Sequence, residues 1–235
     1  MAEGSAAERG GLRRRVPKAP DVVLARPIEA ADLMLATLHR RPFSDPDWIY
    51  EFKYDGFRGL VRKSGDRVEL LSRNGNLLNG SFPDIVESVS SNPGDFVWDA
   101  ELTVDDQNGR PSFERLQIRA KTTKSGNVRA AARLHPARLY VFDVLSIGQR
   151  DVRGLSLAIR KELLRDSFED TDKLIYASGI VGAGRWVFEQ VEAHGFEGMV
   201  AKRLASTYQR GRSRDWLKIK HAGYGRPAAM GFGRK

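Results

Sequence analysis

Residues 48–58 read Trp-Ile-Tyr-Glu-Phe-Lys-Tyr-Asp-Gly-Phe-Arg, and this stretch says more about the fold than any other part of the 235-residue chain. Its first six residues are mostly aromatic or β-branched, which predicts a strand, and Asp55-Gly56 predicts the turn that ends it. Lys53 therefore lies at the end of a strand and faces a turn whose carboxylate can hold a metal ion. A lysine amine in this position is suited to attack on phosphorus. A Lys-x-Asp-Gly run is also typical of a solvated turn.

A pair of lysines near the end of the chain has strand spacing. Residues two apart in a strand share a face, so Lys218 and Lys220 point together while Leu217 and Ile219 face the core. Two ammonium groups side by side are costly unless an anion lies between them, and a triphosphate is the natural candidate. The alternative is two surface lysines on an edge strand.

The same spacing pairs Asp99 with Glu101, and Tyr140 with Phe142. The two rings can offer an aromatic platform to a base, or they can belong to a plain core strand.

Glu197 opens an apolar strand, where a carboxylate suits Mg²⁺, an ion that needs oxygen ligands and keeps waters. A solvated glutamate at a helix–strand corner is the alternative. Glu197 and Lys202 differ by five positions, so a flat strand places them on opposite faces. Either the chain bends at Gly198 or Lys202 has a separate role.

Six segments resemble, in order, the motifs of the covalent nucleotidyltransferases, the superfamily of ATP-dependent DNA ligases, RNA ligases and capping enzymes. They are residues 53–58 (KYDGFR), 72–75 (SRNG), 99–102 (DAEL), 140–143 (YVFD), 197–202 (EGMVAK) and 216–220 (WLKIK). The resemblance covers about residues 25–220. Within the superfamily, these segments most resemble the adenylation domain of bacterial ATP-dependent DNA ligases of the end-joining type.

This resemblance implies a role for each matching residue. Lys53 takes AMP from ATP as a phosphoramidate, Glu51 reads the adenine amino group, and Phe142 stacks on the adenine ring. Glu101 and Arg58 hold the ribose and the neighbouring phosphate.

Further roles concern the DNA, the metals and the triphosphate. The resemblance implies that Arg73 meets the 5′-phosphate of the nick. Asp55 and Glu197 then serve the Mg²⁺ (or Mn²⁺) ions, and Lys218 with Lys220 serves the triphosphate.

The expected fold is α+β, because strands alternate with helices without a regular βαβ pattern. The resemblance implies an ATP-grasp-like nucleotidyltransferase fold of two packed antiparallel sheets flanked by helices. Strands are expected over residues 48–53, 96–104 and 139–145, and a hairpin joins 60–62 to 68–71. Helices are expected over residues 28–40, from a cap at Ser81, from a cap at Ser112, and over 155–168 and 185–194.

The net charge of +9 is concentrated at the two ends of the chain. Residues 1–20 carry +3 and residues 203–235 carry +8, so the residues between them carry −2. This distribution suggests basic ends that meet a polyanion, although a generally basic surface also accounts for it. We expect a disordered basic arm at 1–21, an adenylation domain at 22–222 and a flexible basic tail at 223–235.

Composition limits the class of protein. The absence of cysteine excludes a disulfide framework and a cysteine zinc site. No apolar run approaches the roughly 18 residues of a membrane helix, and the N-terminus lacks the apolar region of a signal peptide. A soluble, cytoplasmic (nucleoid-associated) monomer without membrane contact is therefore expected.

Together the motifs predict an ATP-dependent DNA ligase, or its adenylation domain, that seals nicked or broken double-stranded DNA. Only 15 residues follow Lys220, too few for the OB domain of full ligases, so a protein supplying that clamp in trans is a further expectation. An RNA ligase remains an alternative, as does a nucleic-acid-binding remnant without catalysis.

Overall fold

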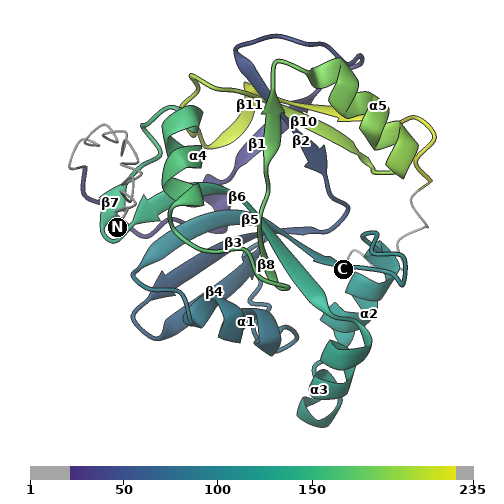
Figure 1. The fold of residues 1–235 in the computed structure, drawn as a ribbon. Helices are drawn as coiled ribbons and strands as arrows, with labels where there is room; N and C mark the ends of the chain where they lie inside the picture. Colours follow the sequence, from purple (N-terminus) through teal and green to yellow (C-terminus); the bar gives the residue numbers. More distant parts are fainter. Residues whose placement is uncertain (1–21, 226–235) are drawn as a thin grey trace, which may run out of the picture.

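The computed structural model describes residues 22–225, which form two β-sheets and five α-helices (Figure 1). The expected basic arm at 1–21, and the part of the expected tail beyond residue 225, lie outside the described residues. None of the helices within residues 22–225 has the length and apolar character needed to cross a bilayer.

The two sheets differ in size. The large sheet has strand order β4-β3-β5-β6-β7, with β8 added beside β6. Its strands are β3 (Phe57–Ser64), β4 (Arg67–Ser72), β5 (Phe96–Val104), β6 (Ala137–Ile147), β7 (Arg150–Asp151) and β8 (Leu174–Tyr176). The small sheet has order β1-β11-β10-β2-β9. Its strands are β1 (Met34–Leu38), β2 (Trp48–Lys53), β9 (Gly179–Val181), β10 (Gly198–Arg203) and β11 (Gly211–Lys220).

The expectation of two antiparallel sheets needs one correction in each sheet. β1 runs parallel to β11, and β8 runs parallel to β6. Both parallel strands are reached by long connections rather than by hairpins, as parallel pairing requires.

Apolar side chains form three layers. The helices are α1 (Pro83–Ser90), α2 (Phe113–Lys121), α3 (Ser125–Leu134), α4 (Leu157–Arg165) and α5 (Gly184–His194). One cluster lies under the large sheet and includes Ile85 of α1 and Trp98 of β5. A second joins the two sheets through residues such as Leu60 and Trp216. A third packs α5 onto the small sheet through Val187. The second cluster places one face of each sheet against the other.

Most strands and caps lie where the sequence predicts them. The hairpin of β3 and β4 and the strand Phe96–Val104 are confirmed. The Ser112 hydroxyl accepts a hydrogen bond from the Arg115 amide at the start of α2. The helix predicted over 185–194 ends at Gly195, which adopts φ +69°, a left-handed conformation that glycine tolerates best.

Two predicted features are wrong. Residues 28–40 form a 3₁₀ turn at Ala30–Asp32 and then β1, because β1 gains a ladder of hydrogen bonds from β11 while Met34 fills the layer between the sheets. Ser81 does not cap α1. Its hydroxyl donates to the Ala120 carbonyl instead, and Phe82 occupies the cap position.

A buried ion pair joins α4 to the large sheet. Arg160 makes two hydrogen bonds to Asp143 of β6, at 2.8 and 2.9 Å, and both side chains are fully buried. The same guanidinium donates to the carbonyls of Leu155 and Ser206, and Ser206 lies just after β10 of the small sheet. Arg160 therefore connects the two sheets through α4.

We predict that Arg160→Met lowers the free energy of unfolding by about 3–5 kcal/mol, because it leaves the Asp143 carboxylate buried without its partner. Urea denaturation measures the change. Arg165→Met is the matched control on the same helix, since its pair with Asp170 is exposed and should be worth less than about 1 kcal/mol. Equal effects of the two substitutions would contradict the role given to Arg160.

Candidate active site

The central strand of the small sheet, β10, aligns the charged residues of the site. It pairs with β2 on one side and with β11 on the other. Gly198 is opposite both Lys53 and Lys220, and Val200 is opposite both Glu51 and Lys218. Side chains directly across a ladder share a face. The prediction that Lys218 and Lys220 point together is therefore confirmed, and Lys53 lies on their face.

Glu197, just before β10, binds two of these lysines. Its Oε2 accepts a hydrogen bond from Lys53 Nζ at 2.5 Å, and its Oε1 is 3.2 Å from Lys220 Nζ. Glu197 is buried, whereas the side chain of Lys220 is 52% exposed and that of Lys53 is 23% exposed. One carboxylate facing two ammonium groups leaves the centre with a net positive charge.

More cations surround Lys218. Its pKa is lowered by burial first and then by the positive charges of Lys220, Arg212, Lys53 and Arg73. The backbone amide of Arg73 donates to the carbonyl of Arg58 at 2.9 Å, which fixes its loop beside β3. Arg212 was not among the predicted site residues. Such a convergence of positive charge is suited to an anion with several charges.

Glu51 lies at the buried end of the site, between two lysines. Its Oε1 accepts from Lys161 Nζ at 2.7 Å and its Oε2 from Lys202 Nζ at 2.5 Å. Lys202 also lies 4.2 Å from the centre of the Phe142 ring and 4.4 Å from that of the Trp216 ring. The open question about Lys202 is thus answered, because it pairs with Glu51 rather than with Glu197.

Lys161 was missed by the sequence reasoning, although a signal exists. It comes from α4, where Leu157, Lys161 and Leu164 are all buried. The spacing of four and three residues defines the buried face of a helix. A lysine on that face needs an acidic partner inside the protein.

Phe142 lies at an irregularity in β6. Val141 pairs with Ala100 and Asp143 pairs with Asp99, so Phe142 has no partner on β5. A bulge of this kind re-aims a side chain, and the half-buried ring of Phe142 contacts Lys202 and Arg58.

The expected platform of two rings does not form. Tyr140 stacks on Tyr54 instead, with ring centres 3.9 Å apart. Of the expected pair, Phe142 is half-buried, whereas Tyr140 is buried.

Arg58 is held by Asp99. Its guanidinium makes two hydrogen bonds to that carboxylate, at 2.9 and 2.6 Å, and Tyr208 donates to the same carboxylate at 2.6 Å. Glu101 lies next to this pair on β5. Burial raises the pKa of Glu101 to about 7, against the lowering effects of Lys53 and Arg58.

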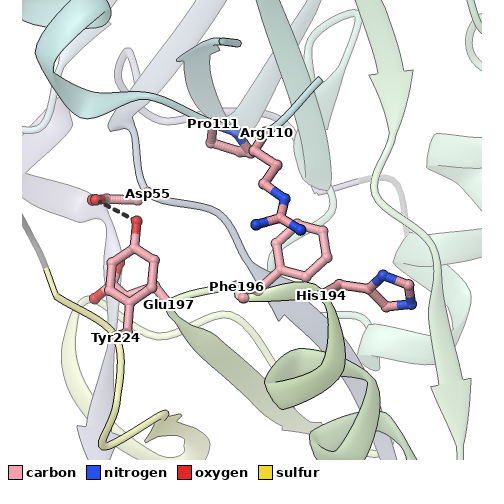
Figure 2. Close-up of a pocket in the computed structure, with 8 residues that line it drawn as sticks. Asp55, Arg110, Pro111, His194, Phe196, Glu197 and Tyr224 are labelled. Atoms are coloured by element: carbon pink, nitrogen blue, oxygen red, sulfur yellow. Dashed lines mark hydrogen bonds between the residues drawn. The ribbon is translucent and has the colours of Figure 1, made fainter. Parts of the chain in front are cut away.

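A pocket at the edge of the site contains the two carboxylates predicted to serve metals. It is lined by Asp55, Arg110, Pro111, His194, Gly195, Phe196, Glu197 and Tyr224 (Figure 2). The Tyr224 hydroxyl donates to Asp55 Oδ2 at 2.9 Å, a contact that no motif predicts.

The pocket supplies some of the oxygen ligands that a divalent cation requires. Within residues 22–225 no group of three or more histidine or acidic side chains is arranged around a common point. Asp55 and Glu197 nevertheless supply oxygen donors from one pocket wall, and Mg²⁺ is commonly bound by one or two carboxylates together with substrate phosphates and water. The donor set fits Mg²⁺ carried by a phosphate substrate.

A lysine beside a cluster of cations, between two packed sheets, is the arrangement of a nucleotidyltransferase site, and comparison with known proteins gives the family. Residues 24–220 match the ATP dependent DNA ligase domain, so the chain belongs to that family.

Two relatives illustrate the relationship. DNA ligase C of Mycobacterium tuberculosis is 36% identical over 185 residues, which are 75% of this chain and 51% of that protein. The multifunctional non-homologous end joining protein LigD of Pseudomonas aeruginosa is 32% identical over 190 residues, which are 79% of this chain and 21% of that protein. The chain thus spans about half of the first relative and about a fifth of the second.

Solved structures agree with this assignment. The ligase domain of LigD from M. tuberculosis has a TM-score of 0.67 and 28% identity, covering 81% of this chain and 59% of that one. A mycobacterial DNA ligase D complexed with ATP and MES has a TM-score of 0.66 and 28% identity, covering 81% and 60%. The α+β fold is therefore the fold of a ligase adenylation domain.

The raised pKa of Glu101 predicts a pH dependence. Between pH 4.5 and about 7 the folded protein keeps a proton on Glu101 that the unfolded chain has released, so this residue makes the fold less stable as the pH rises through that interval. Glu101→Gln stays neutral at every pH. The free energy of unfolding of the wild type should therefore fall relative to the variant between pH 4.5 and about pH 7. A difference that is constant with pH would contradict the assignment.

Proposed function

We propose that this chain is the catalytic adenylation domain of an ATP-dependent DNA ligase, which works through a lysyl-AMP intermediate. The observation that supports this most directly is the position of Lys53, whose Nζ lies against Glu197 on the same sheet face as Lys218 and Lys220. The proposed nucleophile then lies beside the charges that a triphosphate needs.

In the first step the Lys53 amine attacks the α-phosphorus of ATP. A nitrogen–phosphorus bond forms, the bond from the α-phosphorus to the bridging oxygen breaks, and pyrophosphate leaves. The ammonium loses one proton before the attack, and the nitrogen loses a second as the phosphoramidate forms. Glu197 Oε2, at 2.5 Å, is the acceptor in contact with Lys53 Nζ, and solvent takes up the protons. Lys218 and Lys220 neutralise the charge that develops on the pyrophosphate.

The nucleoside is held by the residues around Phe142. The half-buried ring of Phe142 stacks on adenine, and Glu51 accepts a hydrogen bond from the adenine amino group. A carboxylate has about four lone-pair positions, so Glu51 can do this while it keeps both lysine partners. Glu101 and Arg58 hold the ribose and the adjacent phosphate.

Asp55 and Glu197 would hold Mg²⁺ or Mn²⁺ at the pocket. When bound, the ion neutralises phosphate charge during the displacement. Asp55 can do this while it keeps the hydrogen bond from Tyr224, because a carboxylate has about four lone-pair positions.

The second substrate is nicked or broken double-stranded DNA. We infer that Arg73, in the exposed loop after β4, contacts the 5′-phosphate that receives AMP from Lys53. Several relatives, the P. aeruginosa protein among them, carry non-homologous end joining in their names, and we propose that this chain serves DNA repair of that kind. An OB-type clamp supplied by a partner protein would help to hold the DNA.

We predict that the protein becomes covalently labelled when it is incubated with α-labelled ATP and Mg²⁺. The label should survive denaturation, be released by acid as expected for a phosphoramidate, and be absent from Lys53→Ala. GTP should label poorly if Glu51 reads the adenine amino group. Wild-type labelling of Lys53→Ala would contradict the proposal.

The facing lysines give a second prediction. Lys218→Ala should slow charging with ATP by about a hundredfold, because it removes a fixed charge from the leaving pyrophosphate. Sealing of DNA that already carries AMP needs no pyrophosphate to leave and should change far less. If Lys218→Ala affects both steps equally, Lys218 does not act on the triphosphate.

A further inference from the structure

A long part of the chain near the site carries positive charge without any acid. Residues 115–142 contain seven lysines and arginines and no aspartate or glutamate. They form most of α2, all of α3 and the first half of β6. The near-neutral total of the central residues conceals this local excess.

Two of the seven cations form ion pairs within the fold. Arg119 is fully buried and pairs with Asp84, and Arg138 pairs with Asp105 at 2.8 Å. Of the other five, Arg115 is half-buried, and Lys121, Lys124, Arg129 and Arg133 are exposed.

Among the described residues, three of these exposed cations, Lys124, Arg129 and Arg133, have no acidic partner. Within residues 22–225, no ion pair involves Lys124, Arg129 or Arg133. Arg129 and Arg133 are four positions apart on α3, so they lie one above the other on one face of the helix.

The start of α3 adds to the positive field. Its first turn contains no acidic residue, and the cap residue Lys124 makes no capping hydrogen bond through its side chain. The amino end of a helix carries partial positive charge, which natural sequences usually offset with an acid or a capping oxygen. A lysine at this position favours an external anion.

The basic helix pair begins at the rim of the active site. Arg110 and Pro111, which precede α2, line the pocket that contains Asp55 and Glu197 (Figure 2). From there α2 packs against the large sheet through the buried Leu116, and α3 extends beyond it (Figure 1). α3 buries only Val128 completely, so most of its surface is available.

We propose that the α2–α3 pair is a second nucleic-acid contact, which binds the phosphate backbone of the duplex beside the break through Lys124, Arg129 and Arg133. Phosphate contacts fix the position of a protein on DNA without reading its sequence. The choice of duplex DNA as the ligand rests on the proposed function. The charge and the position of the surface do not depend on that function.

The test is binding of a nicked duplex by Arg129→Gln/Arg133→Gln at several salt concentrations. We expect the affinity at low salt to fall by about tenfold. The slope of log affinity against log salt should become smaller by about two, since each phosphate that is no longer neutralised removes about 0.9 from it. Arg129→Lys/Arg133→Lys keeps the charge and should retain most of the affinity. Thermal unfolding shows whether each variant remains folded.

Arg67→Gln/Arg165→Gln is the matched control. It removes the same charge from two exposed arginines that begin β4 and end α4. Its affinity and salt slope should stay close to those of the wild type. Unchanged binding by Arg129→Gln/Arg133→Gln, or an equal loss in the control pair, would overturn the proposal. Charging of Lys53 by ATP is measured separately on the wild type, so failure of the enzymatic assignment is distinguishable from failure of this surface.

Discussion

The pairing register of β10 between β2 and β11 determines where every charged group of the site lies. It sets Lys53 and Lys220 across from one residue of β10, and Glu51 and Lys218 across from another. A slip of one residue would turn each of these side chains to the opposite face of the sheet. The apolar residues between them, such as Ile219, prevent that slip because they are buried against α5. Packing on one face of the small sheet thus determines which charged side chains lie on the other face.

Buried charge is concentrated around the proposed nucleoside position. Glu51 with its two lysines, and Asp143 with Arg160, are almost completely removed from water. Desolvation cancels much of the attraction in such pairs, so they are poor devices for stability. We infer instead that these pairs fix the positions of the two sheets relative to each other. α4 supplies Arg160 and Lys161, and through these two residues it contacts both sheets. A site that lies between two sheets needs such a link, because its residues come from both sheets and must keep their relative positions.

Local patterns in the sequence predicted the strands that carry the motifs and the face that Lys218 and Lys220 share. They were sufficient because strand periodicity depends on neighbours within a few residues. The helix expected over residues 28–40 failed because hydrogen bonds from β11, more than 170 residues away, outweighed a helical spacing of apolar residues. The contacts of Lys161 and Tyr224 arise only when distant elements pack together. The surface charge of α3 was visible in the sequence but was hidden by summing over the whole central region.

The central claim is that the face shared by Lys53, Lys218 and Lys220 binds the triphosphate of ATP. A crystal structure of the chain with a non-hydrolysable ATP analogue and Mg²⁺ tests it most directly. The account predicts that the α-phosphorus lies beside Lys53 Nζ and that the outer phosphates contact Lys218 and Lys220. It predicts that adenine stacks on the Phe142 ring. It also predicts that Lys202 remains bound to Glu51. A nucleotide whose phosphates point away from Lys218 and Lys220, or one bound outside the space between the sheets, would contradict it.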